Sequence, residues 1–348
     1  MKRVRNALCL ALSFMIVVML FVSCSPKEDP LPVDPDTSIT VTDHLGRTVE
    51  LPGPAQRVIG THNPSMNMVV VLDGNGSRIA GFGSKDMSYG IYDVIAPEIE
   101  TVTQIGKGKE LNIETVISVE PDLLIIPARF QSSIEQMDEL NIPCIALDVE
   151  KFDSIKSALL LVGKAIGQEE RAQTIVQFYD EMISKMDGIA KAAEEKPRVL
   201  MLSKSSPTAV STDAMLQNLM IETAGGTNVT AGFQPDELWT EVDIEQIIAW
   251  NPDVIYVPVY ATYTVEDILN DPQWASISAV KNKKVYRFPS TLEPWDYPVA
   301  ASCLGLCWVT YNLHPEIYSF EDLMEDVDRY YQFVYGRTFD VEEFGFTD

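Results

Sequence analysis

One sixteen-residue phrase occurs twice in this chain. Residues 112–127 read NIETVISVEPDLLIIP and residues 243–258 read DIEQIIAWNPDVIYVP, with six identical positions at a constant offset of 131 residues. This offset is far longer than the period of about 20–50 residues found in solenoid arrays, so it indicates a duplicated domain. At 348 residues the chain also exceeds what one core comfortably supports, and we expect two domains of ordinary size.

Each copy of the phrase predicts a short helix followed by a buried strand. Asn112 and Asp243 are good N-cap residues, which places Glu114 and Glu245 in the first turn of each helix. Taken singly, each glutamate complements a helix N-terminus, a contribution of about 0.3–1 kcal/mol. Helix N-termini and strand carboxyl ends share one end of an alternating sheet, the end where ligands bind. The equivalent placement of both glutamates therefore favours a paired docking role at the rim of that end.

Strand-like and helix-like segments alternate along the rest of the chain. The alternation predicts an α/β fold with largely parallel sheets covered on both faces, preceded by a β-hairpin over residues 39–52. Gly167 divides a helical region, and the longer helix, from about residue 169 to 193, is a plausible spine between the two halves. We expect an N-terminal lobe over residues 39–166, a linking helix over 167–196 and a C-terminal lobe with terminal helices over 197–348.

The first residues have the pattern of an export signal. MKRVRN is basic, and residues 7–22 form an almost unbroken apolar run of sixteen residues, which is short for a membrane span. The run ends in LFVSC, which resembles the lipobox of bacterial lipoproteins. We predict a lipoprotein signal peptide over residues 1–23 and a lipid anchor on Cys24; a plain signal peptide with an incidental cysteine is the alternative. Residues 24–38 are rich in proline and polar residues, as a tether should be.

The charge of the mature chain excludes one class of partner. Loss of Lys2, Arg3 and Arg5 with the signal leaves 23 basic against 51 acidic side chains, a formal charge of 23 − 51 = −28. Such a surface repels nucleic acid and anionic lipid. An acidic surface that keeps an exported protein soluble is the simplest interpretation.

Three cysteines remain beside the signal peptide and the anchor: Cys144, Cys303 and Cys307. An odd number in an exported protein argues against a disulfide framework, although Cys303 and Cys307 are four residues apart in an apparent helix. We predict buried free thiols.

Five segments in a fixed order resemble the substrate-binding proteins of ABC importers for ferric siderophores, cobalamin and haem. They extend from about Ile39 to Tyr335 and read TVTDHLGRTVELPGPAQRVIG, LNIETVISVEPDLLII, LLVGKAIGQEERAQTIV, DIEQIIAWNPDVIYV and LEPWDYPVAASCLGLCWVTYNLHPE. The resemblance implies two Rossmann-like α/β lobes joined by one long α-helix, with the ligand cleft between them. It also implies that Glu114 and Glu245 pair with arginines of a permease dimer, which works with its ATPase. We expect a monomer tethered outside the cytoplasmic membrane.

The ligand is expected to be anionic. Loops at strand carboxyl ends should line the cleft, and these loops carry basic residues, Lys109 among them, together with aromatic ones. The ligand-binding candidates are His62, Lys85, Lys107, Arg129, Lys204, Trp239, Tyr260, Trp295 and Tyr297. For each of them, a solvated lysine or a core aromatic residue is the alternative. We predict capture of a ferric siderophore-type metal chelate, with no resident cofactor or metal.

Other ligands of the same family stay open. Molybdate or tungstate fits the basic loops almost as well as a ferric chelate, and haem is a further alternative. Trp239 precedes Glu245 by six residues, the spacing of a ligand-contacting tryptophan in cobalamin-binding relatives. Gly108 stands at the matching place before Glu114, where those relatives also have tryptophan, and this departure weakens a cobalamin assignment.

The sequence does not favour an enzyme. It contains no GxSxG, HExxH or GxxxxGK motif and no GxGxxG after a strand. With three histidines in the whole chain, a dedicated zinc or manganese site is not favoured either. A lipoprotein that presents its ligand to a membrane sensor, rather than to a permease, is the alternative from another class.

Overall fold

The computed structural model describes residues 38–83, 89–108, 110–233 and 239–346. The folded unit comprises Ile39–Asp348. The predicted signal peptide, the predicted anchor residue Cys24, almost all of the predicted tether, and the candidates Lys85 and Lys109 lie outside the described residues.

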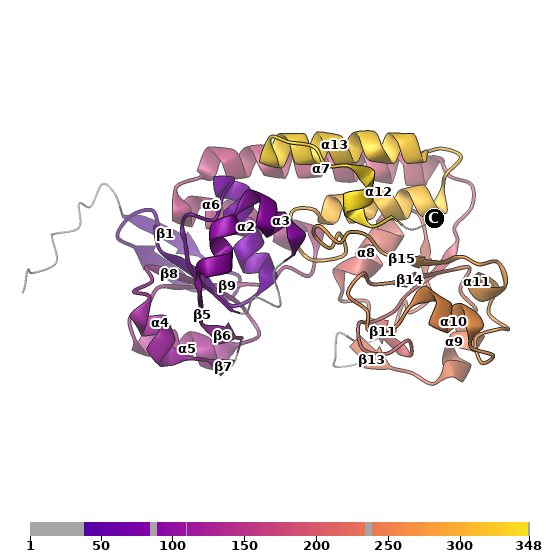
Figure 1. Cartoon of the computed structure of the whole chain (residues 1–348), viewed down its shortest axis with the longest axis horizontal. Coiled ribbons are helices and arrows are strands. Elements are labelled where there is room, and N and C mark those ends of the chain that lie inside the picture. Colours follow the sequence, from indigo (N-terminus) through magenta and orange to yellow (C-terminus); the bar gives the residue numbers. More distant parts are fainter. Residues whose placement is uncertain (1–37, 84–88, 109, 234–238, 347–348) are drawn as a thin grey trace, which may run out of the picture. The chain divides into compact units, whose positions relative to one another are not determined.

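The N-terminal lobe is built on a parallel sheet with the strand order β5-β4-β3-β8-β9 (Figure 1). The strands are β3 (Val58–Gly60), β4 (Ile79–Phe82), β5 (Thr103–Gln104), β8 (Leu123–Pro127) and β9 (Cys144–Leu147), with a small hairpin of β6 (Gly106–Lys107) and β7 (Glu110–Leu111). The helices are α2 (Asn63–Asp73), α3 (Gly90–Ile95), α4 (Ile113–Ser118), α5 (Gln131–Glu139) and α6 (Phe152–Ile166), with a 3-10 turn at Pro97–Thr101. The antiparallel pair β1 (Ile39–Thr42) and β2 (Thr48–Leu51) confirms the predicted β-hairpin.

Alternate residues of β8 show why this sheet is buried on both faces. Leu123 and Ile125 belong to a core cluster completed by α2 and α6, whereas Leu124 and Ile126 pack with residues of α4 and α5. Side chains along a strand alternate between faces, so an unbroken apolar run marks a strand with helices on both sides. The predicted parallel sheet with two covered faces is confirmed.

The C-terminal lobe repeats this design with the parallel strand order β12-β10-β14-β15. The strands are β10 (Arg198–Met201), β12 (Thr227–Asn228), β14 (Val254–Val257) and β15 (Val285–Arg287), with a separate antiparallel pair of β11 (Ala209–Ser211) and β13 (Trp239–Glu241). The helices are α8 (Leu216–Thr223), α9 (Ile244–Trp250), α10 (Val265–Asn270), α11 (Ser278–Lys281), α12 (Ser302–Leu313) and α13 (Phe320–Tyr335), with a 3-10 turn at Val341–Phe344. Both copies of the repeated phrase therefore form a short helix and a central strand.

Asp122 and Asp253, an identical pair in the repeated phrase, have the same structural role in the two lobes. The carboxylate of Asp122 accepts a hydrogen bond from the backbone N–H of Arg57 at 2.9 Å, and Asp253 accepts one from that of Arg198 at 3.0 Å. Each aspartate thus fixes the start of the neighbouring strand, β3 or β10. The Arg57 side chain donates to the carbonyl oxygen of Val119, just after α4, at 2.5 Å. The Arg198 side chain donates to the carbonyl oxygen of Trp250, the last residue of α9, at 2.6 Å. The repeat therefore preserves a helix-to-strand connection.

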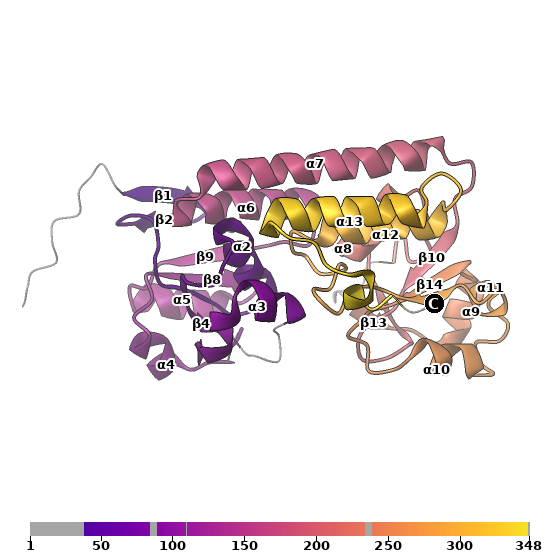
Figure 2. The same ribbon diagram turned by 45° about the horizontal axis from the view of Figure 1, so that its top comes forward.

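One long helix joins the lobes. α6 ends at Gly167, whose φ of 74° lies in the left-handed region that favours glycine. α7 (Glu169–Ala192) follows with 24 residues, or about 36 Å at about 1.5 Å per residue. It packs on α6 of the first lobe and α12 of the second, and it lies beside α13 (Figures 1 and 2). Lys185 of α7 forms an ion pair with Asp326 of α13 at 2.6 Å.

The three described cysteines are buried free thiols, as predicted. Cys144 lies in β9, and Cys303 and Cys307 lie in α12. Burial raises the pKa of the Cys144 thiol to about 12, so this side chain stays an unreactive thiol at neutral pH.

Gly305 in α12 packs closely against the backbone of Trp295, in the segment that precedes this helix. A Cβ atom at this position would lie 2.2 Å from the backbone oxygen of Trp295, a contact that requires backbone movement. Gly305→Ala should therefore lower the free energy of unfolding by about 1–3 kcal/mol. A Cβ atom at Gly188 in α7 would meet no other described atom within 4 Å, and Gly188→Ala should instead raise stability by about 0.5–1 kcal/mol. Urea unfolding measures the free energy of unfolding of both variants. The same change in both would contradict the close packing at Gly305.

Candidate ligand-binding site

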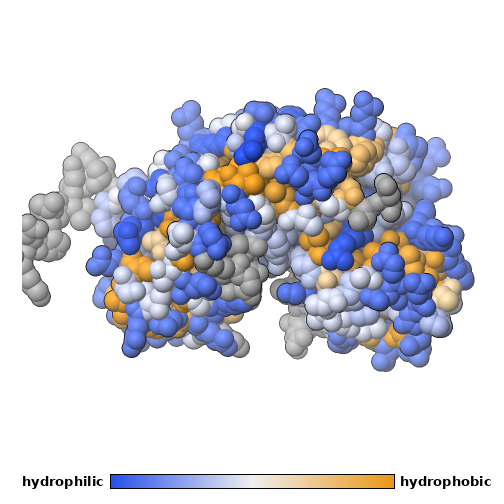
Figure 3. Space-filling view, viewed as in Figure 1, coloured by the Kyte–Doolittle hydropathy of each residue, from blue (hydrophilic) through white to orange (hydrophobic). Residues whose placement is uncertain are grey.

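A cavity lies between the two lobes, where the surface is hollowed (Figure 3). Its volume is about 770 Å³, within the range of about 300–1,000 Å³ typical of pockets for small organic ligands. The N-terminal lobe contributes His62, Asn63, Pro64, Ala128, Arg129 and residues 147–151 to its wall, and the C-terminal lobe contributes Ala214, Met215, Gln217, Trp239, Tyr260, Tyr297 and Pro298. The predicted cleft between lobes is thus present.

Each copy of the repeated phrase is followed, two residues after its end, by one residue of the cavity wall. Arg129 lies two residues after β8, and Tyr260 occupies the position 131 residues later, after β14. Both side chains line the cavity. Parallel strands present the residues after their carboxyl ends at one edge of the sheet, so the duplication places these two positions at the cavity, one from each lobe.

Three helices begin at the cavity wall. His62 is the N-cap residue of α2, Lys151 that of α6 and Met215 that of α8. Neither the His62 nor the Met215 side chain accepts a hydrogen bond from the first turn of its helix. The first N–H groups of a helix lack partners within the helix, and the helix dipole favours negative charge there. Both lobes therefore offer donors to an anionic group.

The charged residues of the wall are balanced in number. Arg129 and Lys151 are basic, and Asp148 and Glu150 are acidic. Burial raises the pKa of the Glu150 carboxyl, and nearby Arg129 opposes part of that shift. Arg129 is exposed to solvent and its guanidinium lies 4.9 Å from the centre of the Phe130 ring. Arg129 and Lys151 are thus the two exposed basic side chains of the wall.

His62 contributes a neutral imidazole. Burial, with a smaller effect of Arg129, lowers the pKa of His62 to about 3. Its Nδ1 atom lies 2.6 Å from the hydroxyl oxygen of Ser65, within hydrogen-bonding distance. At neutral pH this residue therefore adds polarity to the cavity but no positive charge.

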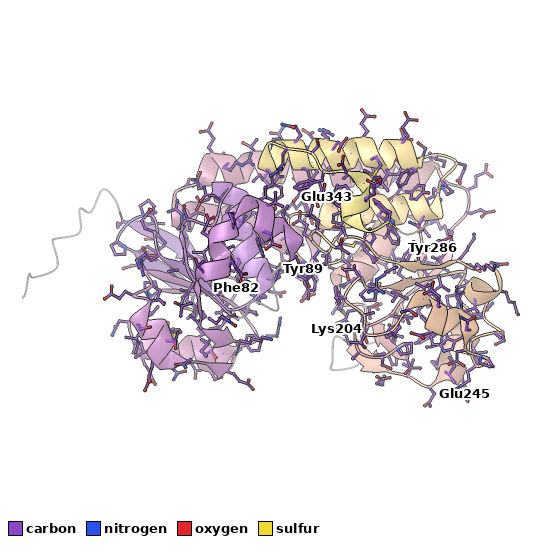
Figure 4. All side chains as sticks on the ribbon, viewed as in Figure 1. Phe82, Tyr89, Lys204, Glu245, Tyr286 and Glu343 are labelled. Carbon is purple, nitrogen blue, oxygen red and sulfur yellow. The ribbon has the colours of Figure 1, made fainter. Side chains whose placement is uncertain are left out.

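The structure brings together five of the sequence-predicted candidates and separates others. His62, Arg129, Trp239, Tyr260 and Tyr297 all line the cavity. Lys107 and Lys204 are exposed and are not among the residues that line the cavity. Figure 4 shows Lys204 on the side of its lobe that faces the other lobe.

Trp295 lies in the core instead of the wall. It is fully buried, and its indole N–H donates to the Tyr331 hydroxyl at 3.1 Å. Trp295 lies two residues before the wall residue Tyr297, so the sequence alone does not distinguish it from a ligand contact. Its hydrogen bond to Tyr331 on α13 holds it in the core.

Two groups of wall residues were not predicted from the sequence. Residues 148–151 follow β9, and Met215 and Gln217 lie at the start of α8. The first group could have been found, because β9 was predicted and its carboxyl end belongs to the same sheet edge. The second carries no charge or aromatic ring, so composition gave no signal for it.

Gly108 has a packing reason to differ from its counterpart Trp239. Its φ is 49°, and a Cβ atom there would lie 2.6 Å from a ring atom of Phe130. The Phe130 ring thus takes the space beside this position. The tryptophan of the second lobe has no equivalent in the first, as the sequence indicated.

The two glutamates of the repeated phrase are exposed. Glu114 lies in the first turn of α4 and Glu245 in that of α9. Figure 4 places Glu245 at the edge of its lobe. Ile117 and Ile248, one helical turn further on, are 50% and 38% exposed. Each lobe therefore shows an acidic and an aliphatic side chain on the same helix face.

The described residues give no sign of a resident metal or a membrane-spanning helix. They contain no group of three or more His, Cys, Asp or Glu side chains arranged to hold a metal ion. Within the same residues, no helix combines the length and apolar character that crossing a bilayer requires.

The chain belongs to the periplasmic binding protein family, whose sequence profile matches residues 71–292. This confirms the resemblance to the substrate-binding proteins of ABC importers. The molybdate-binding protein MolA of Haemophilus influenzae is 27% identical over 86% of this chain and 91% of its own length. The crystal structure of MolA bound to molybdate has a TM-score of 0.77, with 26% identity over 86% of this chain and 99% of MolA. The Fe(3+)-citrate-binding protein YfmC of Bacillus subtilis is 23% identical over 82% of this chain and 90% of its own length.

Proposed function

We propose that this protein is the lipid-anchored, extracytoplasmic binding component of an ABC importer, and that it captures a ferric siderophore-type metal chelate. The observation that carries the ligand class is the cavity between the lobes. Helix N-termini and Arg129 supply donors and positive charge for an anionic ligand. Trp239, Tyr260 and Tyr297 supply apolar ring surface for an organic part.

The size of the cavity favours a chelate over a bare oxyanion. A volume of about 770 Å³ suits a drug-sized organic molecule, and a single tetrahedral anion leaves most of it to water. Ferric citrate, named for the relative YfmC, is a small anionic chelate of the proposed class.

Molybdate is the second candidate, because one specific observation favours it. The relative named for molybdate binding, MolA, covers nearly the whole folded chain at 27% identity. Three helix N-termini at one wall also suit a compact oxyanion. Tungstate has the same shape and charge as molybdate, and cobalamin and haem stay as weaker alternatives.

The proposed delivery step uses both lobes. Glu114 and Glu245 are exposed, equivalent and accompanied by exposed isoleucines, a pattern that suits contact with a permease dimer. Cys24 would hold the monomer at the membrane through its lipid, with residues 24–38 as the tether.

Arg129 gives the sharpest test of the ligand site. Arg129→Glu places a negative charge where we propose an anionic ligand, and the affinity for ferric citrate should fall at least about tenfold. Lys281→Glu makes the same charge change at an exposed position on α11, outside the wall, and should alter the affinity by less than about threefold. Isothermal titration calorimetry measures both variants. Equal losses would show that only net charge matters, and an unchanged Arg129 variant would remove this residue from the site.

A further inference from the structure

Asp296 lies directly behind the cavity wall. It belongs to the segment between β15 and α12 and is fully buried. Its carboxylate oxygen Oδ2 accepts a hydrogen bond from the Tyr260 hydroxyl at 2.5 Å, and its backbone carbonyl accepts one from the Gln217 side-chain amide at 2.9 Å. Tyr260 and Gln217 line the cavity, whereas Asp296 does not. One buried residue thus holds two wall residues that come from different elements.

The Tyr260 ring is also fixed by its neighbours. It stacks on Tyr297, with ring centres 5.0 Å apart and an angle of 29° between the rings. Tyr297 meets the edge of Tyr89 at 5.6 Å, and Tyr89 precedes α3 of the other lobe (Figure 4). The two cavity tyrosines therefore form a flat surface that is supported from both lobes.

The hydrogen bond from Tyr260 to Asp296 determines whether the Tyr260 hydroxyl can donate to a ligand in the cavity. At pH 8, above the raised pKa of about 7 of the Asp296 carboxyl, this group is mostly ionised and only accepts hydrogen bonds. The Tyr260 hydroxyl then donates its single hydrogen to Asp296. The phenol oxygen can then accept from a ligand but cannot donate to it. A bare oxyanion needs donors and gains none here, whereas an organic ligand gains contact with the ring faces.

Asp296 lies in an environment that is unfavourable for a carboxylate. Its second oxygen, Oδ1, is buried and has no hydrogen-bond partner among the described residues. Burial of a carboxylate with an unpartnered oxygen destabilises a fold. Local features that oppose stability are expected at functional sites, which favours a role at the cavity.

We propose that Asp296 is a positioning residue that makes the Tyr260–Tyr297 surface select organic metal chelates over bare oxyanions. This inference rests on the proposed function, because it assigns a ligand class to the same cavity. Asp296 acts through Tyr260 and Gln217 and touches no ligand itself.

The test compares two probes, ferric citrate and molybdate, by calorimetry at pH 8 with folded variants. In Asp296→Ala the Tyr260 hydroxyl is free to donate and its ring is less restrained. The ratio of ferric citrate affinity to molybdate affinity should therefore fall about tenfold. Asp296→Asn keeps an acceptor for Tyr260, so its ratio should stay within about twofold of the wild type. A purely structural role predicts a loss of melting temperature with an unchanged ratio, and that result would overturn the inference.

Tyr260→Phe gives an independent outcome if the alanine variant fails to fold. The phenylalanine ring can still stack on Tyr297, but it loses the hydrogen bond that fixes Tyr260 to Asp296. The ratio of ferric citrate affinity to molybdate affinity should therefore fall about threefold, and an unchanged ratio would contradict the inference. Absence of binding of both probes by the wild type would defeat the proposed function and this inference with it. Binding with unchanged selectivity in Asp296→Ala would defeat the inference alone.

Discussion

Reversal of both exposed glutamates, Glu114→Lys together with Glu245→Lys, should abolish ligand uptake while the affinity for ligand stays unchanged. Each change turns a proposed attraction to a basic permease group into repulsion, which costs several kcal/mol per contact. We expect uptake into cells that carry the cognate permease to fall at least about a hundredfold. Calorimetry on the purified variant provides the check on ligand affinity, because both residues are exposed and neither lines the cavity.

The two single variants and a matched control show whether the loss of uptake comes from these two positions. Glu114→Lys and Glu245→Lys alone should each reduce uptake, because one docking contact remains on the other lobe. Glu181→Lys changes charge by the same amount on α7, far along the chain from both copies of the repeated phrase, and should leave uptake unchanged. Normal uptake by the double variant would contradict the importer assignment and favour delivery to a membrane sensor.

The second large expected effect is that two buried carboxyl groups, those of Glu293 and Asp296, make the fold less stable as the pH rises toward 8. Ordinary acid unfolding has the opposite direction, since stability there falls as the pH falls. Burial raises the pKa of Glu293 from 4.5 and that of Asp296 from 3.8, each to about 7. In the unfolded chain both groups ionise at their ordinary values. Their contribution to stability is therefore complete below pH of about 4 and is lost as the pH rises through about 7. The loss approaches about 3 kcal/mol for Glu293 and about 4 kcal/mol for Asp296.

Urea unfolding at pH 5 and pH 8 measures this effect. Glu293→Gln removes the ionisable group while its amide nitrogen and oxygen can still meet Asn67, which donates to Glu293 at 3.1 Å. The change in stability between pH 5 and pH 8 should shift by about 2.5 kcal/mol, with the variant relatively more stable at pH 8. An unchanged m-value would show that the unfolding reaction is the same. The same pH profile for variant and wild type would mean that Glu293 is not buried as an acid.

Much of the fold could be predicted because its signals are local. The apolar runs of β8 and β14 mark strands buried on both faces, and Gly167 marks the end of one helix before α7. Because the phrase is duplicated, the helix and strand of the first lobe predict those of the second. The same offset relates the strand-end positions Arg129 and Tyr260.

The composition of the cavity could be predicted only in part, since it depends on how loops of two lobes face each other. Lys107 and Lys204 occupy strand-end loops in the sequence but lie outside the wall. Trp295 is drawn into the core by Tyr331, a partner 36 residues away. The role of Asp296 depends on Tyr260 at the same range, and no spacing rule connects them.

The central claim is that the cavity between the lobes holds an anionic metal chelate. Isothermal titration calorimetry of the wild-type protein against ferric citrate, a ferric catecholate complex, cobalamin, haem and molybdate tests it most directly. We predict saturable binding of one stoichiometric equivalent of a ferric chelate, tighter than that of molybdate. Exclusive binding of a neutral or cationic molecule would contradict the account.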